Sequence, residues 1–209
     1  DAPEGAYQPS EVPTLIQAIF NFQTSGDLAW PDIGFNFIVD EFGTIWEGRQ
    51  GSIDAPIACE TEGGDPGHTQ HVAFLGQFSA APPTPLATEA MVSLLAWLAN
   101  RDGVATQPGD LTNFISEGSD KFPAGEKVTV RTIAGHREIA DVGCPGDPVM
   151  NDVVADLQGL VNGERARLDP AAAAGGATAT TVVGGTGLPP AIDDQSPTSG
   201  FETPPVTRR

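Results

Sequence analysis

Residues 135–146 have the sequence GHREIADVGCPG. The sequence on either side predicts that this stretch connects a strand to a helix. The β-branched run at residues 128–133 precedes this stretch and favours a strand. Pro148, just after it, is typical of the first turn of a helix. His136 and Cys144 therefore lie on one strand-to-helix connection, and both are soft donors that suit Zn²⁺. Two ligands do not complete a site, so the rest of the chain has to supply the other groups.

The hydrophobic pattern predicts three amphipathic helices. Ser10 is the expected N-cap of the first, Thr84 and Pro85 open the second, and Gly103 ends it. The third is expected at residues 148–162. Strands are expected at residues 33–39, 44–49, 56–60, 71–78 and 128–133, the first two as a hairpin, and a surface loop at 105–127.

Strands interleaved with helices predict an α/β domain with a mixed central β-sheet and amphipathic helices on both faces. We expect this domain at residues 1–162. Residues 163–209 are rich in Ala, Gly, Pro and Thr, which predicts a linker or disordered tail. Residues 177–183 have strand propensity, so addition of that run to a sheet edge is a less favoured alternative.

The chain has 209 residues and a net charge of −18, which argues against nucleic-acid binding. No apolar run approaches the ~18 residues of a membrane span. The chain does not begin with Met, and we expect a fragment of a longer protein. Its two cysteines, Cys59 and Cys144, fit either one disulfide or a structural thiol plus a metal ligand.

Five motifs resemble those of the peptidoglycan recognition protein and type 2 N-acetylmuramoyl-L-alanine amidase family. They are WPDIGFNF at residues 30–37, FGTIWEGR at 42–49, VAFLGQF at 72–78, GHRE at 135–138 and CPG at 144–146. Their order and spacing match the family, and the resemblance covers roughly residues 7–162. It implies a peptidoglycan or muropeptide partner and a secreted or cell-envelope location.

The resemblance also implies a chemistry. Members of this family hydrolyse the amide between N-acetylmuramic acid and L-alanine, with Zn²⁺ held by two His and one Cys. By resemblance, His136 and Cys144 are two of these three ligands. Arg49 corresponds to a groove residue that meets a carboxylate of the stem peptide, against the alternative of a surface ion pair. Glu60 takes the place of a groove His.

Three departures put hydrolysis in doubt. The strand that carries the family's first ligand would precede Asp1, its active-site Tyr aligns with Phe35, and a polar residue near the zinc Cys aligns with Val142. We therefore assign no catalytic residue and predict a peptidoglycan recognition domain with weak or no hydrolysis, a candidate pseudoenzyme with an incomplete zinc site.

Two alternatives stay open at this point. One is a zinc amidase whose first ligand lies upstream, and the other is an inert scaffold domain. Replacement of the missing ligand by His68 or His71, and a cysteine hydrolase built on Cys144 and His136, are less favoured. No oligomeric state is predicted.

Overall fold

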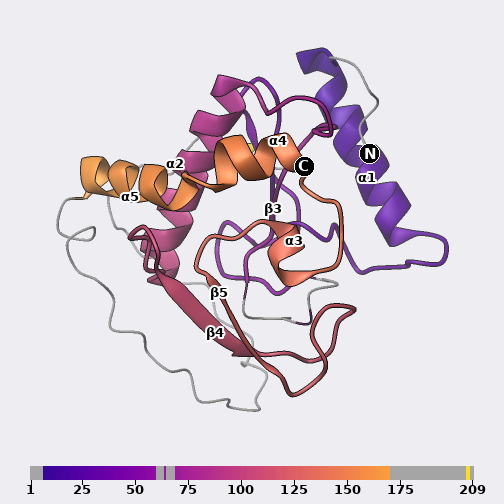
Figure 1. Cartoon of the computed structure of the whole chain (residues 1–209). Coiled ribbons are helices and arrows are strands. Elements are labelled where there is room, and N and C mark those ends of the chain that lie inside the picture. Colours follow the sequence, from indigo (N-terminus) through magenta and orange to yellow (C-terminus); the bar gives the residue numbers. More distant parts are fainter. Residues whose placement is uncertain (1–6, 60–63, 65–68, 170–205, 208–209) are drawn as a thin grey trace, which may run out of the picture.

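The computed structural model describes residues 7–59, 64, 69–169 and 206–207, and Figure 1 shows their arrangement. The helical elements are η1 (Pro9–Glu11), α1 (Val12–Thr24), α2 (Pro85–Asp102), α3 (His136–Ile139), α4 (Asp147–Val149), the π-helical turn η2 (Met150–Val154) and α5 (Leu157–Leu168). The strands are β1 (Phe37–Val39), β2 (Ile45–Glu47), β3 (Val72–Phe74), β4 (Leu111–Ile115), β5 (Lys127–Arg131) and β6 (Val206–Thr207).

The central sheet is mixed and has the strand order β3-β1-β2-β6. β1 and β2 form the predicted antiparallel hairpin, with Ile38 opposite Trp46. β3 runs parallel to β1 on the other side and places Ala73 opposite Ile38. The fully buried Asp40 organises the hairpin turn, because its carboxylate accepts from the backbone amides of Phe42 and Thr44 at 3.0 and 2.9 Å.

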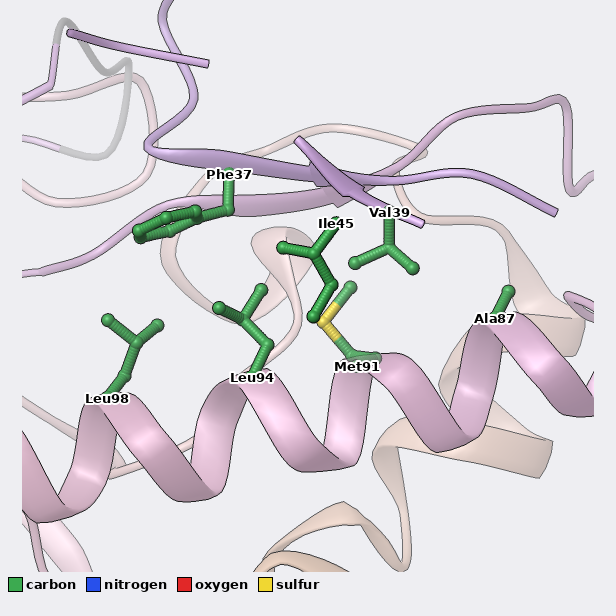
Figure 2. Packing of buried hydrophobic residues seen from close by; sticks show 7 residues of the cluster. All are labelled: Phe37, Val39, Ile45, Ala87, Met91, Leu94 and Leu98. Atoms are coloured by element: carbon green, nitrogen blue, oxygen red, sulfur yellow. The ribbon is translucent and has the colours of Figure 1, made fainter. Parts of the chain in front are cut away.

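Helix α2 covers one face of this sheet. Its start and end are as predicted: Thr84 Oγ1 accepts from the Ala87 amide at 3.1 Å, and Gly103 ends the helix with a φ of 68°. Figure 2 shows side chains of β1 and β2 pointing toward apolar residues of α2. The cluster consists of Phe37, Val39, Ile45, Ala87, Met91, Leu94 and Leu98.

Helix α1 covers the opposite face. Ile38, which alternates with Phe37 and Val39 along β1, packs in a second cluster with Val12 and Ile16. Successive strand residues point to opposite faces, and both faces are covered, so all three residues of β1 are buried. The prediction of a mixed sheet with helices on both faces is confirmed.

The helices after residue 146 differ from the single helix predicted at 148–162. The helical path starts in α4, passes through η2 and continues in α5 to Leu168. The sequence after Asn162 is polar, but Arg165 is only 7% exposed and its guanidinium donates to Asn100 Oδ1 and Thr106 Oγ1, both at 2.7 Å. The buried, hydrogen-bonded Arg165 thus extends the helix along α2. Hydrophobic periodicity does not predict this extension, because the residue is polar.

The loop predicted at residues 105–127 is also wrong, because β4 pairs with β5 in a separate antiparallel sheet. Only Phe114 of β4 is buried, and it lies opposite Val128. Leu111 and Ile115 are 60% and 55% exposed, so the strand lacks the apolar-inward pattern that would have identified it.

Three smaller predictions also need correction. Residues 56–59 form no strand, and the first helical turn is the 3₁₀ turn η1 that follows Gln8, so Ser10 is not an N-cap. Val206–Thr207 falls in the predicted tail but forms a strand beside β2. Residues 177–183 lie outside the described residues. Within the described part of the chain, no helix is long and apolar enough to cross a membrane.

Candidate functional site

The GHRE motif forms α3, and an ion pair fixes this short helix to its surroundings. Glu138 Oε2 accepts from the Gly135 amide at 2.7 Å, so a side chain of the first turn satisfies the amide of the N-cap residue. The Arg131 guanidinium donates to both carboxylate oxygens of Glu138, at 3.0 and 2.6 Å, and to the Val154 carbonyl at 3.2 Å. α3 is therefore tied to β5 and to η2, and the position of His136 is set by these contacts.

Arg137 closes the loop between the two predicted ligands. Its amide donates to the Cys144 carbonyl at 3.2 Å, and its guanidinium donates to the Gly143 carbonyl and to Asp147 Oδ1. His136, half-buried at the start of α3, and Cys144, exposed, thus lie on one segment that Arg137 closes. Val142 is half-buried in the same loop.

Both cysteines are free thiols, so the alternative of a Cys59–Cys144 disulfide is wrong. Cys59 is buried and donates to Asn36 Oδ1 at 2.9 Å. Although part of Cys144 is exposed, desolvation raises the pKa of its thiol, and the guanidinium of Arg137 opposes this shift. Without a bound metal the Cys144 side chain therefore holds its proton more tightly than an ordinary cysteine.

The described donors do not complete a zinc site. Among residues 7–59, 64, 69–169 and 206–207, no three His, Cys, Asp or Glu side chains gather where they could hold a metal ion. His71, considered as a replacement ligand, instead places its Nε2 2.6 Å from Thr69 Oγ1 at the start of β3. His68 lies outside the described residues. His136 and Cys144 thus do not by themselves fit Zn²⁺, which takes at least three protein ligands.

Phe35 and Arg49 lie together where the β1–β2 hairpin opens. The Arg49 amide donates to the Phe35 carbonyl at 2.8 Å. A Cβ on Gly48 would lie 2.2 Å from the same carbonyl oxygen, so only glycine permits this close approach. Both Phe35 and Arg49 are half-buried, and Phe35 packs against the cluster beneath α1.

Asn36 is the centre of a buried polar network that the sequence did not predict. Its Nδ2 donates to Ser52 Oγ at 3.0 Å and to the Ile57 carbonyl at 2.8 Å, and its Oδ1 accepts from the His71 amide at 2.7 Å. Asn36 therefore joins β1 to the start of β3 and to the loop at residues 52–59. The one feature of the sequence that could have indicated this network is the polar Asn36 side chain within the apolar run IGFNFIV at residues 33–39. Glu60, which follows this loop, lies outside the described residues.

Gly146 connects the motif loop to the segment after β3. Its φ is 94°, and a Cβ there would lie 2.3 Å from the Phe78 carbonyl oxygen. A cavity of about 490 Å³ begins at Phe78 and extends past Tyr7 and Thr84, beyond the ends of β1 and β3. A second cavity, of about 530 Å³, borders Arg137 and contains none of the predicted site residues.

This arrangement of a mixed sheet between α1 and α2 is the fold of the peptidoglycan-recognition proteins. Human PGRP-IBETAC, crystallised in complex with glycosamyl muramyl pentapeptide, superposes with a TM-score of 0.52 at 23% sequence identity. The superposition covers 73% of this chain and 76% of that one.

Sequence comparison leads to the same group. Peptidoglycan-recognition protein SC1a of Drosophila melanogaster is 24% identical over 139 residues, which cover 66% of this chain and 60% of that protein. Peptidoglycan-recognition protein SC2 of the same organism is 25% identical over 126 residues, 60% of this chain and 54% of that protein. The chain thus spans about 60% or less of the length of these curated relatives. No protein-family model matches the chain. The homologues of this chain are peptidoglycan-recognition proteins, and the predicted resemblance to that family is confirmed.

Proposed function

We propose that this chain is a peptidoglycan recognition domain that binds muropeptide, with weak or no hydrolysis. The observation that carries this proposal is the shared fold with a protein crystallised around a muramyl pentapeptide. The sequence relatives, which are named for peptidoglycan recognition, support the same class of ligand. The ligand implies that the protein acts outside the cytoplasm, so a secreted or cell-envelope location is part of the proposal.

Two apolar side chains support weak or absent hydrolysis. By the resemblance described above, Phe35 and Val142 occupy positions at which active amidases carry polar groups. Neither side chain can donate a hydrogen bond to a developing oxyanion or handle a proton. Loss of one such oxyanion partner typically lowers the rate ~10²–10³-fold. The Phe35 ring instead contributes to packing beneath α1.

We propose Arg49 as the residue that contacts a carboxylate of the stem peptide. A planar guanidinium matches the two oxygens of a carboxylate better than a lysine ammonium does. The bond from the Arg49 amide to Phe35 fixes where the side chain leaves the hairpin. Glu60 is proposed as a second contact, since the Asn36 network holds the loop that leads to it.

A zinc amidase is the second candidate function, and the presence of His136 and Cys144 on the one segment that Arg137 closes favours it. Zinc remains a proposed cofactor, because a third ligand would have to come from outside the described residues. An inert scaffold domain is the remaining alternative.

Calorimetric titration of the full chain with a muramyl pentapeptide tests the proposed function. We expect saturable binding that Arg49→Ala weakens at least 10-fold, whereas Arg167→Ala, an exposed arginine of α5, leaves the affinity unchanged. Product analysis by liquid chromatography with added Zn²⁺ should detect little or no cleavage of the amide. Stoichiometric zinc together with steady turnover would support the amidase instead. If the chain binds no muramyl pentapeptide either with or without zinc, the result would support the inert scaffold domain.

A further inference from the structure

The outer edge of β2 is covered by a segment far away in the sequence. β6 runs parallel to β2, with Val206 opposite Ile45 and Thr207 opposite Trp46. The other edge of β2 pairs with β1, so β6 lies at the end of the strand order. This pairing involves neither Arg49 nor Glu60, the residues proposed above to contact the muropeptide.

The backbone of β2 shows which of its groups face β6. The Gly48 amide donates to the Asn36 carbonyl at 2.9 Å, and the Thr44 carbonyl accepts from the Asp40 amide at 3.1 Å. Thr44 and Gly48, which flank β2, therefore direct these backbone groups toward β1. Because backbone groups alternate along a strand, those of Ile45 and Glu47 face the opposite edge, where β6 lies.

If the outer edge of β2 were uncovered, it could pair with strands of other chains and cause aggregation. Two of the three residues of β2 are apolar: Ile45, which is 2% exposed, and Trp46, which is half-buried. Apolar edge strands with unpaired amides and carbonyls pair with other chains unless something blocks or covers them. The described part of the chain covers this edge with β6.

We propose that the outer edge of β2 is a strand-acceptor site for an extended peptide, and that Val206–Thr207 is its resident ligand within the same chain. The site recognises backbone rather than particular side chains, as strand addition does elsewhere.

The shortness of β6 makes this ligand exchangeable. Two residue pairs offer few backbone bonds, so the same segment supplied as a separate peptide would bind weakly. Attachment to the chain converts binding into an intramolecular event with an effective concentration in about the millimolar range. An extended peptide that pairs with all of β2 and its flanks could therefore displace β6.

Amide hydrogen exchange on the full chain tests the proposal. The double variant Val206→Pro, Thr207→Pro removes both N–H groups of β6, including the one that faces β2, and Thr198→Pro is the matched control. In the double variant, the amides of Ile45 and Glu47 should exchange at least 10-fold faster, while the Trp46 amide, which faces β1, stays protected. Equal exchange at Ile45 and Glu47 in all three proteins would overturn the proposal.

Two further measurements cover the cases in which proline disrupts more than β6. The variant Val206→Gly, Thr207→Gly keeps the amides and should give an intermediate acceleration. A synthetic peptide of residues 200–209 should restore protection of Ile45 and Glu47 in the double-proline variant, with saturable dependence on peptide concentration. Protection in the original protein should not change on dilution. Loss of protection on dilution, with dimers in sedimentation, would place a second copy at the edge and overturn the intramolecular assignment.

Discussion

Arg131 and Glu138 form a two-pronged ion pair that fastens the helix carrying His136 to strand β5. Both side chains are about one-quarter exposed, and the Glu138 carboxylate also caps α3 through the Gly135 amide. The Glu138 carboxylate thus both caps the start of α3 and attaches this helix to β5. This pair thus helps to hold the backbone on which the candidate ligand His136 lies.

Glu138→Gln should lower the free energy of unfolding by about 1–2 kcal/mol, since a neutral amide replaces a charged acceptor of three hydrogen bonds. Urea denaturation monitored by tryptophan fluorescence measures the change. The matched control is Glu164→Gln, which weakens the more exposed pair with Arg167 and should change stability little. Equal losses in the two variants would argue against a special role for the Arg131 pair.

Tyr7→Phe should destabilise the protein, because the Tyr7 hydroxyl donates to the Leu75 carbonyl and accepts from the Glu41 amide, both at 2.9 Å. Deletion of one buried hydroxyl that satisfies two backbone groups costs about 1–3 kcal/mol. Chemical denaturation at neutral pH measures this loss. A stability within error of the original protein would contradict the bridging role.

Tyr7 also predicts a loss of stability at high pH. Burial raises the pKa of Tyr7 from 10.0 to about 12. Since the unfolded chain loses this proton first, the stabilisation is fully present below pH 10 and falls as the pH rises toward 12. The loss reaches about 2 kcal/mol. Subtracting the Tyr7→Phe profile from the original one isolates it, and parallel profiles between pH 9 and 11.5 would be the contrary result.

Asn36→Ala should cost about 3 kcal/mol or more, because it removes an amide whose three partners, in the loop at residues 52–59 and at the start of β3, are then left unsatisfied. Thermal unfolding measures the loss. Asn21→Ala, on the exposed side of α1, provides the control and should be close to neutral. We expect exchange of the His71 amide to increase in the Asn36 variant only.

The two thiols should react very differently with an aromatic disulfide reagent. Cys144 is exposed and should be modified in the native protein, whereas Cys59 is buried and should react only after unfolding. Because desolvation raises the pKa of Cys144, its rate at pH 7 should be below that of an ordinary exposed cysteine and should increase with pH. The Cys144→Ser variant should lose the native-state reaction, and retention of that reaction would contradict the assignment.

Hydrophobic periodicity was sufficient for β1, β2 and β3 of the central sheet and for the two helices that cover it, but not for β6. Helix α2 illustrates this. Thr84 caps its start, Gly103 ends it, and an apolar stripe lies between them, and each of these features can be predicted from local sequence. The motif loop was also predictable: His136 and Cys144 are close in sequence, and Arg137 joins them through local contacts.

The features that were missed depend on partners distant in sequence. β4 gained its structure from pairing with β5, although Leu111 and Ile115 remain exposed. The extension of α5 depends on the burial of Arg165 against Asn100 and Thr106. Local propensity contains no information on such tertiary contacts.

Helix α2 has a consequence for how the molecule unfolds. One side of it packs on the central sheet, and Ala96 packs in the cluster formed by η2 and α5. Leu95 and Phe74 contact both clusters. A helix shared in this way couples the two halves of the hydrophobic interior, so neither half can melt while the other stays intact. Heat or denaturant should therefore produce one cooperative transition, and the calorimetric and van't Hoff enthalpies should agree.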